Sequence, residues 1–446
     1  MLRKLQTLLA VALTFNMASQ AFALGSANIA NEVPSARAAG QGYVGVAGQN
    51  EDPIVTFVNP AGMTGLKGTQ ITLGTTYENL HGEYDDPSGN KTQMRSVDIA
   101  VPNGAVTHSF MDGKLAAGIA ILSPFGLETH WAGDSPLRYV ATDSRLHLVY
   151  VSPAIAYKAC DMVSIGAGVD YVNAFDASLE RKVNVAALNS ALSGGLDTSG
   201  GDANSRLDGT GANWGYRAGV TVQPTEQHAF GIVYHSKVKL DINGTAQLQG
   251  LTGTSASAGV FGGTNYATSA NTTIFLPQNI QFGYSYKPTE KWMVEADAAW
   301  YDWYSLRDIN VNYAGATATQ SAILNSTGNP EPLTLRDAWS FATGVNYKQS
   351  EKLQLRTGFW YEPWAAPEST FNPAFMDLTR YGLTAGFGYT FTEHVSLDFA
   401  YNAVFFHNRS ITNNVGASTT GNPAYNVDGT YKNFTNLVAA NVNFRY

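Results

Sequence analysis

The sequence predicts an all-β transmembrane protein: a 14-stranded antiparallel β-barrel preceded by a segment that lies inside its lumen. Three observations predict this fold class. Apolar and polar residues alternate in many short runs, short polar turns alternate with long loops, and the chain ends in the alternating run Val438, Ala440, Val442, Phe444, Tyr446. Such a run has one apolar and one polar face, as a barrel wall in lipid requires.

Residues 1–23 predict a secretory signal peptide. Basic residues at positions 3 and 4 precede an apolar stretch that ends near Phe15, and Ala21-Phe22-Ala23 has the small residues after which signal peptidase cleaves. A membrane-anchoring helix needs roughly 18 or more apolar residues, and Asn16 interrupts this stretch too early. We therefore expect export and a mature chain that starts near Leu24.

The composition of the whole chain narrows its class. Charged residues are only 14%, whereas the 446 residues include 44 glycines and 12% aromatics. About a quarter of an ordinary soluble protein is charged, so this balance suits a barrel in lipid. The net charge of −8 argues against nucleic acid as a partner. No later apolar stretch is long enough for a transmembrane helix, which excludes a helical membrane protein.

Alternation marks the predicted strands individually. Trp292, Val294, Ala296, Ala298 and Trp300 share one face, and Glu295 and Asp297 lie on the other. The stretches 353–359 and 395–402 show the same pattern. Soluble β-sandwiches also alternate, so the connections between strands must discriminate between the two classes.

The connections favour an outer-membrane barrel, which has tight turns on one side and long loops on the other. Counting strands through them gives fourteen, with both chain ends on the side of the short turns. The short turns are 111–113, 160–161, 223–227, 287–291, 348–352 and 392–393, and the long Gly-, Ser-, Thr- and Asn-rich loops are about 82–93, 132–143, 181–207, 243–273, 305–335, 363–377 and 408–429.

The segment between the signal peptide and the first strand, residues 24–65, does not alternate, and the barrel is expected over residues 66–446. Its small residues and prolines favour a plug packed inside the lumen over a loose tail. Gly40-Gln41-Gly42-Tyr43-Val44-Gly45 formally matches the dinucleotide-binding fingerprint. No strand leads into it and no acidic residue follows at the required distance, so no cofactor is expected.

Several motifs, in order, resemble the FadL-type outer-membrane transporters of long-chain fatty acids and hydrophobic compounds, along nearly the whole mature chain. They are Asn59-Pro60-Ala61, Pro124-Phe125-Gly126-Leu127, Tyr234-His235-Ser236-Lys237-Val238, Leu276-Pro277-Gln278, Lys291-Trp292, Asp302-Trp303 and Arg356-Thr357-Gly358.

The resemblance implies a monomeric barrel in the bacterial outer membrane, inserted by the barrel-assembly machinery and surrounded by outer-membrane lipid. A hydrophobic small molecule or fatty acid would be captured at extracellular loops and passed to an interior pocket. Movement of a hatch that carries Asn59, Pro60 and Ala61 would then release it. A kink in the third strand, at Pro124, Phe125 and Gly126, would open the wall sideways; proline and glycine suit such a break.

The capture region can be located from helix-like spacing in two long loops. Val185, Leu188 and Leu192, with Phe261 in the facing loop, predict an apolar groove at the cell surface. Packing of these loops against each other is the alternative.

Alternation places Arg217, Lys237 and Arg356 on the inner face of the barrel, where one of them could bind a ligand carboxylate. Inward-facing Asp170, Glu295, Asp297 and Asp398 could instead pair with them. If all interior charges are paired, a neutral hydrocarbon becomes the better candidate for the substrate.

Two other functions compete with transport. A general diffusion porin would share the barrel but needs an open lumen without a hatch. An outer-membrane lipid hydrolase needs a serine, a histidine and an orienting partner, and no G-x-S-x-G motif is present. No metal-ligand spacing is recognisable either, so no metal site and no enzyme activity are expected.

Overall fold

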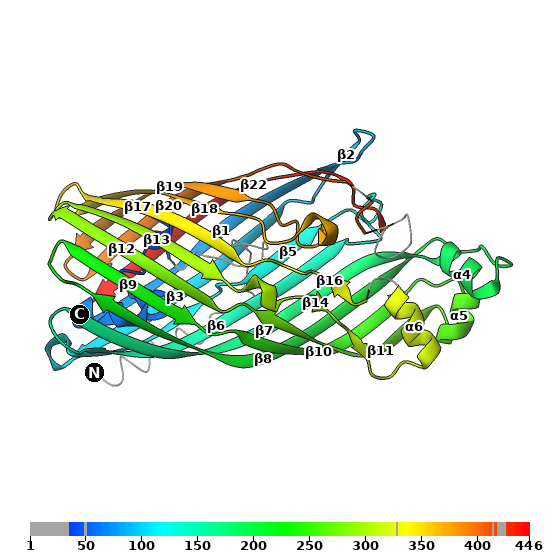
Figure 1. Cartoon of the computed structure of the whole chain (residues 1–446), viewed down its shortest axis with the longest axis horizontal. Helices are drawn as coiled ribbons and strands as arrows, with labels where there is room; N and C mark the ends of the chain where they lie inside the picture. The colour runs from blue at the N-terminus through cyan, green and yellow to red at the C-terminus, as the bar shows by residue number, and fades with distance from the viewer. Residues whose placement is uncertain (1–34, 49–50, 327–328, 413, 417–424) are drawn as a thin grey trace.

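The computed structural model describes residues 35–48, 51–326, 329–412, 414–416 and 425–446. The predicted signal peptide and residues 24–34 of the predicted hatch lie outside the described residues. The described chain forms one closed barrel, with its long axis horizontal in Figure 1. Among these residues, no helix combines the length and the hydropathy needed to cross a bilayer.

Fourteen antiparallel strands close the barrel, as predicted, and three of them are interrupted. The continuous strands are β1 (Thr69–Asp85), β3 (Val97–Phe110), β6 (Asp143–Lys158), β7 (Val163–Asn184), β8 (Asp202–Val222), β13 (Trp292–Tyr301), β17 (Ala338–Lys348), β18 (Leu353–Glu362), β19 (Arg380–Thr392), β20 (Val395–Phe406) and β22 (Gly429–Arg445). The third strand consists of β4 (Leu115–Leu122) and β5 (Gly126–His130), the seventh of β9 (His228–His235) and β10 (Val238–Gln249), and the eighth of β11 (Asn265–Leu276) and β12 (Asn279–Thr289).

The last strand closes the wall against the first. β22 pairs with β1 from Gln70↔Arg445 to Asp85↔Thr430, and with β20 on its other side. Within β22 the side chains of Leu437 and Ala439 are buried inside, whereas the side chain of Val442 is exposed on the outer face. The alternation at the end of the sequence therefore separates the lumen from the lipid-facing surface.

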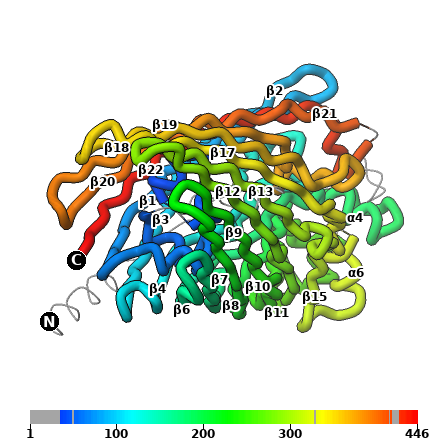
Figure 2. The backbone as a smooth tube through the Cα atoms, turned by 60° about the vertical axis from the view of Figure 1, so that its left-hand side comes forward, coloured from blue at the N-terminus to red at the C-terminus, as the bar shows by residue number. Residues whose placement is uncertain are grey.

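The two ends of the barrel differ as the connections predicted. Tight turns lie at one end, called here the turn end, together with the C-terminus (Figure 1). The long loops lie at the other, the loop end, and carry α4 (Val185–Ser193), α5 (Ala256–Phe261) and α6 (Ala318–Ser326). Figure 1 shows the three helices together, and Figure 2 shows α4 and α6 at the same end. The loops and wall extensions also carry β2 (Lys91–Gln93), β14 (Asp308–Ile309), β15 (Asn312–Tyr313), β16 (Glu331–Pro332) and β21 (Arg409–Ile411).

Caps determine where two of these loop helices begin and end. The side chain of Asn184 accepts a hydrogen bond from the amide of Ala187, and that of Ser255 accepts one from the amide of Ala258. Both helices end at a glycine in the left-handed region, Gly194 for α4 and Gly262 for α5. These are the residue types that satisfy the free amide and carbonyl groups of helix ends.

The outer face carries many large apolar side chains that are exposed around the wall. Soluble monomers rarely expose so much apolar surface, whereas a barrel in lipid requires it. Examples from several strands are Leu73, Ile119, Ile155, Tyr216, Ile232, Phe282, Trp292, Phe341, Leu383 and Tyr389.

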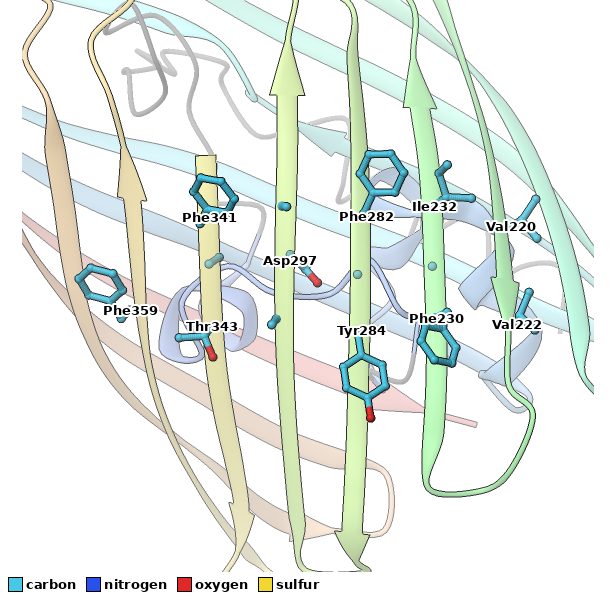
Figure 3. Close-up of a pocket in the computed structure, with 15 residues that line it drawn as sticks. Val220, Val222, Phe230, Ile232, Phe282, Tyr284, Asp297, Phe341, Thr343 and Phe359 are labelled. Carbon is cyan, nitrogen blue, oxygen red and sulfur yellow. The ribbon is translucent and has the colours of Figure 1, made fainter. Parts of the chain in front are cut away.

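The N-terminal segment, residues 35–65 without 49–50, lies inside the barrel. Its elements are α2 (Ala36–Gly40), α3 (Val55–Val58) and η2 (Pro60–Gly65), and every residue of α2 is buried. α2 packs against β19, β20 and β22, while η2 packs against β6, β7 and β8. In Figure 3 this blue segment lies directly behind the wall strands. The N-terminal segment therefore lies across the lumen between opposite sides of the wall, which argues against an open diffusion pore.

Candidate functional site

The Asn59-Pro60-Ala61 motif joins two turns of the N-terminal segment. Asn59 is fully buried, and its Nδ2 donates a hydrogen bond to the carbonyl of Val46 over 2.8 Å. Its Oδ1 accepts from the amide of Ala61 at 3.2 Å and so caps η2, in which Pro60 is the first residue. Proline suits that position because the first helical amide has no partner in the helix.

Two wall glycines allow this motif to lie against the barrel. A Cβ atom on Gly219 would lie 2.1 Å from Asn59 Oδ1, and one on Gly166 would lie 2.4 Å from the amide nitrogen of Ala61. Both distances are far below van der Waals contact. The motif can therefore lie this close to β7 and β8 only because glycine, which has no side chain, occupies these two positions.

Two acidic residues of β13 bind the next turn of the segment. Oδ2 of Asp297 accepts from the amides of Gly45 and Val46 at 2.9 and 3.1 Å. Oε1 of Glu295 accepts from the amide of Ala47 at 2.9 Å. Both carboxylates face inward, as the alternation of β13 predicted, and both act on the backbone of the N-terminal segment.

Arg217 and Arg356, two of the three predicted carboxylate-binding residues, are buried in ion pairs. The guanidinium of Arg217 contacts the Asp170 carboxylate, and its Nη2 donates to the carbonyl of Thr56 at 2.9 Å. Arg356 pairs with Asp398 at 2.5 Å. Both arginines are thus paired with inward-facing aspartates, which was the alternative to binding a ligand carboxylate.

The third residue, Lys237, was predicted on the wrong face. It is exposed on the outside, with its Nζ 5.1 Å from the ring centre of Phe275, while Val238 and Leu240 are buried inside. The seventh strand is interrupted between β9 and β10, and this interruption shifts the alternation by one residue. A sequence pattern read without the interruption places Lys237 inside.

The third strand is broken where the resemblance implied a kink. β4 ends at Leu122, and β5 starts at Gly126. Phe125 is buried between the rings of Tyr150 and Trp303, with ring centres 6.2 and 6.4 Å away. Pro124 cannot donate a ladder hydrogen bond, which is a physical reason for the break.

A small cavity of about 80 Å³ lies between the break and the N-terminal segment. It is the place where the predicted hatch and the predicted lateral opening meet. The break contributes Leu122, Pro124 and Phe125, the segment contributes Tyr43, Phe57 and Val58, and the wall adds Tyr150, Asp170, His235, Ser236, Val238, Pro277, Asn279, Gln281 and Tyr301.

Three further cavities lie nearer the loop end. An apolar one of about 90 Å³ is lined by Leu127, Leu146, Ile242 and Ile274 among others. It shares Leu179, Leu207, Ile309, Val311 and Phe375 with a narrow cavity of about 40 Å³, which in turn shares Val140, Arg181, Asn329, Glu331 and Asn372 with a larger polar cavity of about 310 Å³ among the loops. These cavities form between strands and loops that are far apart in the chain, so no local sequence pattern predicted them.

The predicted capture groove is closed in the structure. Val185 and Phe261 are buried in a cluster of loop residues, and Leu188 and Leu192 pack around it. α4 and α5 are also joined by a hydrogen bond of 2.8 Å from the amide of Ser257 to Asn189 Oδ1. These apolar side chains are packed between the two loops, which is the arrangement given as the alternative to an open groove.

The outer wall has a broad depression of about 650 Å³ across β8, β9, β12, β13, β17 and β18 (Figure 3). Outward-facing Phe230, Ile232, Phe282 and Phe341 line it, around the small residues Ala296 and Ala298. This depression faces the lipid side of the wall. It is therefore separate from the cavities inside the barrel.

A closed antiparallel barrel with an apolar outer band and a lumen filled by its own N-terminal segment is typical of an outer-membrane transport protein. A family model described as "Outer membrane protein transport protein (OMPP1/FadL/TodX)" matches residues 15–446, and the chain belongs to this family. Its place is the outer membrane, and the family transports hydrophobic compounds.

Curated relatives agree with this assignment. The chain is 25% identical over 397 residues to outer membrane protein P1 of Haemophilus influenzae, covering 81% of this chain and 82% of the relative. It is 22% identical over 391 residues to the long-chain fatty acid transport protein of Escherichia coli, covering 83% of this chain and 85% of the relative.

Solved structures share the fold. A FadL homologue of Pseudomonas aeruginosa superposes with a TM-score of 0.79 at 20% identity, covering 95% of this chain and 99% of the other. The toluene transporter TodX of Pseudomonas putida superposes with a TM-score of 0.67 at 18% identity, covering 96% of this chain and all of the other, 100%.

Proposed function

We propose that this protein carries neutral, apolar molecules from the cell surface through the interior cavities and releases them sideways at the break in the third strand. The cavity between that break and the N-terminal segment is the observation that carries the proposal. A cargo there would touch Pro124 and Phe125 on one side and Phe57 of the segment on the other. Displacement of the segment and opening at Gly126 would enlarge this small space.

The physical reason for a sideways exit is the cost of water. An apolar molecule gains roughly 0.8 kcal/mol for each methylene that leaves water. A route that ends in the bilayer lets the cargo leave the protein without crossing water. The apolar cavity near Leu127 and Leu146 lies on the loop-end side of the break, next to the same strands.

The state of the interior arginines supports a neutral cargo over a fatty acid. Arg217 and Arg356, the arginines predicted to bind a carboxylate, are each engaged with an aspartate. Moving a ligand carboxylate to either would require breaking a buried ion pair, which costs several kcal/mol. The relatives include both a fatty acid transport protein and toluene transporters by name, so relatives alone do not choose between the two classes of cargo.

Tryptophan fluorescence of the refolded protein tests the proposal. Trp303 is fully buried and lies 6.4 Å from the ring of Phe125, so it reports on the cavity at the break. We expect saturable changes with toluene and hexadecane that are lost in Trp303→Phe and kept in Trp214→Phe, because Trp214 is exposed on the outer face. A response to oleate alone would favour a fatty acid; no response to any of the three would contradict the proposal.

A further inference from the structure

The inner wall has a row of glycines where the turn Gly42–Ala47 of the N-terminal segment lies against it. In the strand register Gly231 of β9 stands opposite Gly283 of β12, and Gly344 of β17 stands opposite Gly358 of β18. A Cβ atom on each would meet the segment's backbone: Val46 O at 1.9 Å, Ala47 N at 2.7 Å, Gln41 O at 1.9 Å and Gly42 N at 2.4 Å, respectively.

The strand between these two pairs carries acids instead of glycine. β13 lies between β12 and β17, and the register sets Asp297 opposite Gly283 and Glu295 opposite Gly344. These are the carboxylates that accept hydrogen bonds from the amides of Gly45, Val46 and Ala47. The glycine row (Gly231, Gly283, Gly344 and Gly358) therefore lets the turn approach the wall closely, and the two acids bind it by hydrogen bonds.

Carboxylates are strong acceptors for backbone amides because the charge strengthens each hydrogen bond. Glu295 is fully buried and Asp297 is partly buried, so the amides of Gly45, Val46 and Ala47 take the place of water at their carboxylates. Once the turn leaves, water can hydrate both carboxylates. The hydrogen bonds between the turn and the two acids can thus be replaced by hydrogen bonds to water, as a reversible movement of the N-terminal segment requires.

We propose that Glu295 and Asp297 are positioning residues of the gate: they hold the turn Gly42–Ala47 on the glycine row and set how often the N-terminal segment leaves it. This inference rests on the proposed function in one respect, namely that the segment moves during transport. It goes beyond that function by naming the wall residues that control the movement.

Single-channel recording in planar bilayers tests this without any hydrophobic ligand. We expect the wild-type protein to stay closed most of the time, Glu295→Gln/Asp297→Asn to raise the open fraction about tenfold, and Glu295→Ala/Asp297→Ala to raise it further. Gly231→Ala reaches the same turn through the carbonyl of Val46, without touching either acid, and should also open the channel. Asp241→Asn is the matched control, because Asp241 is exposed and pairs with Lys239.

Trypsin cleavage provides the second measurement. Arg37 lies in α2 and is buried, so it should resist trypsin in the closed protein and become cleavable when the segment leaves. Folding of each variant is checked by its heat-modifiable mobility on gels, and the single variant Asp297→Asn, which keeps the shape of the side chain, is used if a double variant does not fold.

The outcomes separate the two proposals. Folded variants that stay closed and keep Arg37 protected would overturn the role of Glu295 and Asp297, whether or not the wild-type protein binds toluene. Variants that open, in a protein that binds no apolar molecule, would support the role of the two acids and contradict the proposed function.

Discussion

Oδ1 of Asn59 lies so close to the backbone of Gly219 that a Cβ atom on this glycine would be only 2.1 Å from it. The asparagine belongs to the N-terminal segment and the glycine to β8, and 160 positions separate them in the chain (219 against 59). The contact shows that the shape of the wall and the motif of the segment fit each other. Gly219→Ala is therefore a test of how the segment is held.

We expect Gly219→Ala to push Asn59 away and to weaken its hydrogen bond to Val46. Overpacking of a buried contact costs typically 1–3 kcal/mol, and here most of this cost should appear as displacement of the segment. Channel conductance and cleavage at Arg37 should both increase. Ala218→Gly is the control, since this neighbour faces outward; equal effects of both substitutions would show that β8 as a whole, and not the contact with Asn59, was disturbed.

Arg217→Ala should destabilise the protein by about 3–5 kcal/mol, because it leaves the carboxylate of Asp170 buried without its partner. Unfolding in urea, followed by tryptophan fluorescence, measures this change. The double variant Arg217→Met/Asp170→Leu should recover much of the loss, since both charges are removed together. Stability unchanged in Arg217→Ala would contradict a structural role of the pair.

Gly126→Val should lower uptake of an apolar cargo at least tenfold, because a branched side chain at the start of β5 fills the break in the third strand. The electrical conductance of the closed protein should not change. Ile119→Phe enlarges an exposed side chain on the outer face of β4 and is the control for added bulk. Undiminished uptake in Gly126→Val would remove the lateral exit from the proposed route.

The contact between the α4 and α5 loops should weaken in acid. Asp197 accepts hydrogen bonds from Ser199 and from the amide of Ala256, and these bonds lower the pKa of its carboxyl. A lowered pKa in the folded state means that the contribution to stability is present above the unfolded value of about 3.9 and is lost as the pH falls through the folded value. The protection factor of the α5 amides, which corrects the exchange rate for its intrinsic dependence on pH, should therefore be constant from about pH 5 to 8 and lower near pH 3.

The variant Asp197→Asn separates this effect from general acid unfolding. It should show low protection of the α5 amides already at neutral pH, while the barrel strands stay protected. If α5 in this variant exchanges as slowly as in the wild-type protein, the carboxylate does not hold the two loops together.

The sequence alone was sufficient for the class of fold and the strand count. Alternation with a period of two, short turns and long loops are local features, and each of them survives in the barrel because neighbouring strands are also neighbours in the chain. The same locality explains the error at Lys237. Alternation is reliable only within an unbroken strand, and the interruption between His235 and Val238 changes the face.

Pairing across the barrel could not be derived from the sequence. Arg217, Arg356 and the acids of the inner wall were all recognised as inward-facing, but which charge meets which depends on the closure of the wall around the N-terminal segment. The loop residues Val185 and Phe261 are a similar case: their apolar character was evident, and only the packing of α4 on α5 decided that they are buried.

The sequence by itself thus determined a barrel in lipid with a segment before it, because alternating strands joined by short turns on one side and long loops on the other are typical of an outer-membrane barrel. Tertiary structure decided how that segment is held. Gly219 contacts Asn59, and the turn Gly42–Ala47 contacts Glu295 and Asp297. These contacts form because closure of the barrel places a glycine or a carboxylate of a distant strand next to the segment.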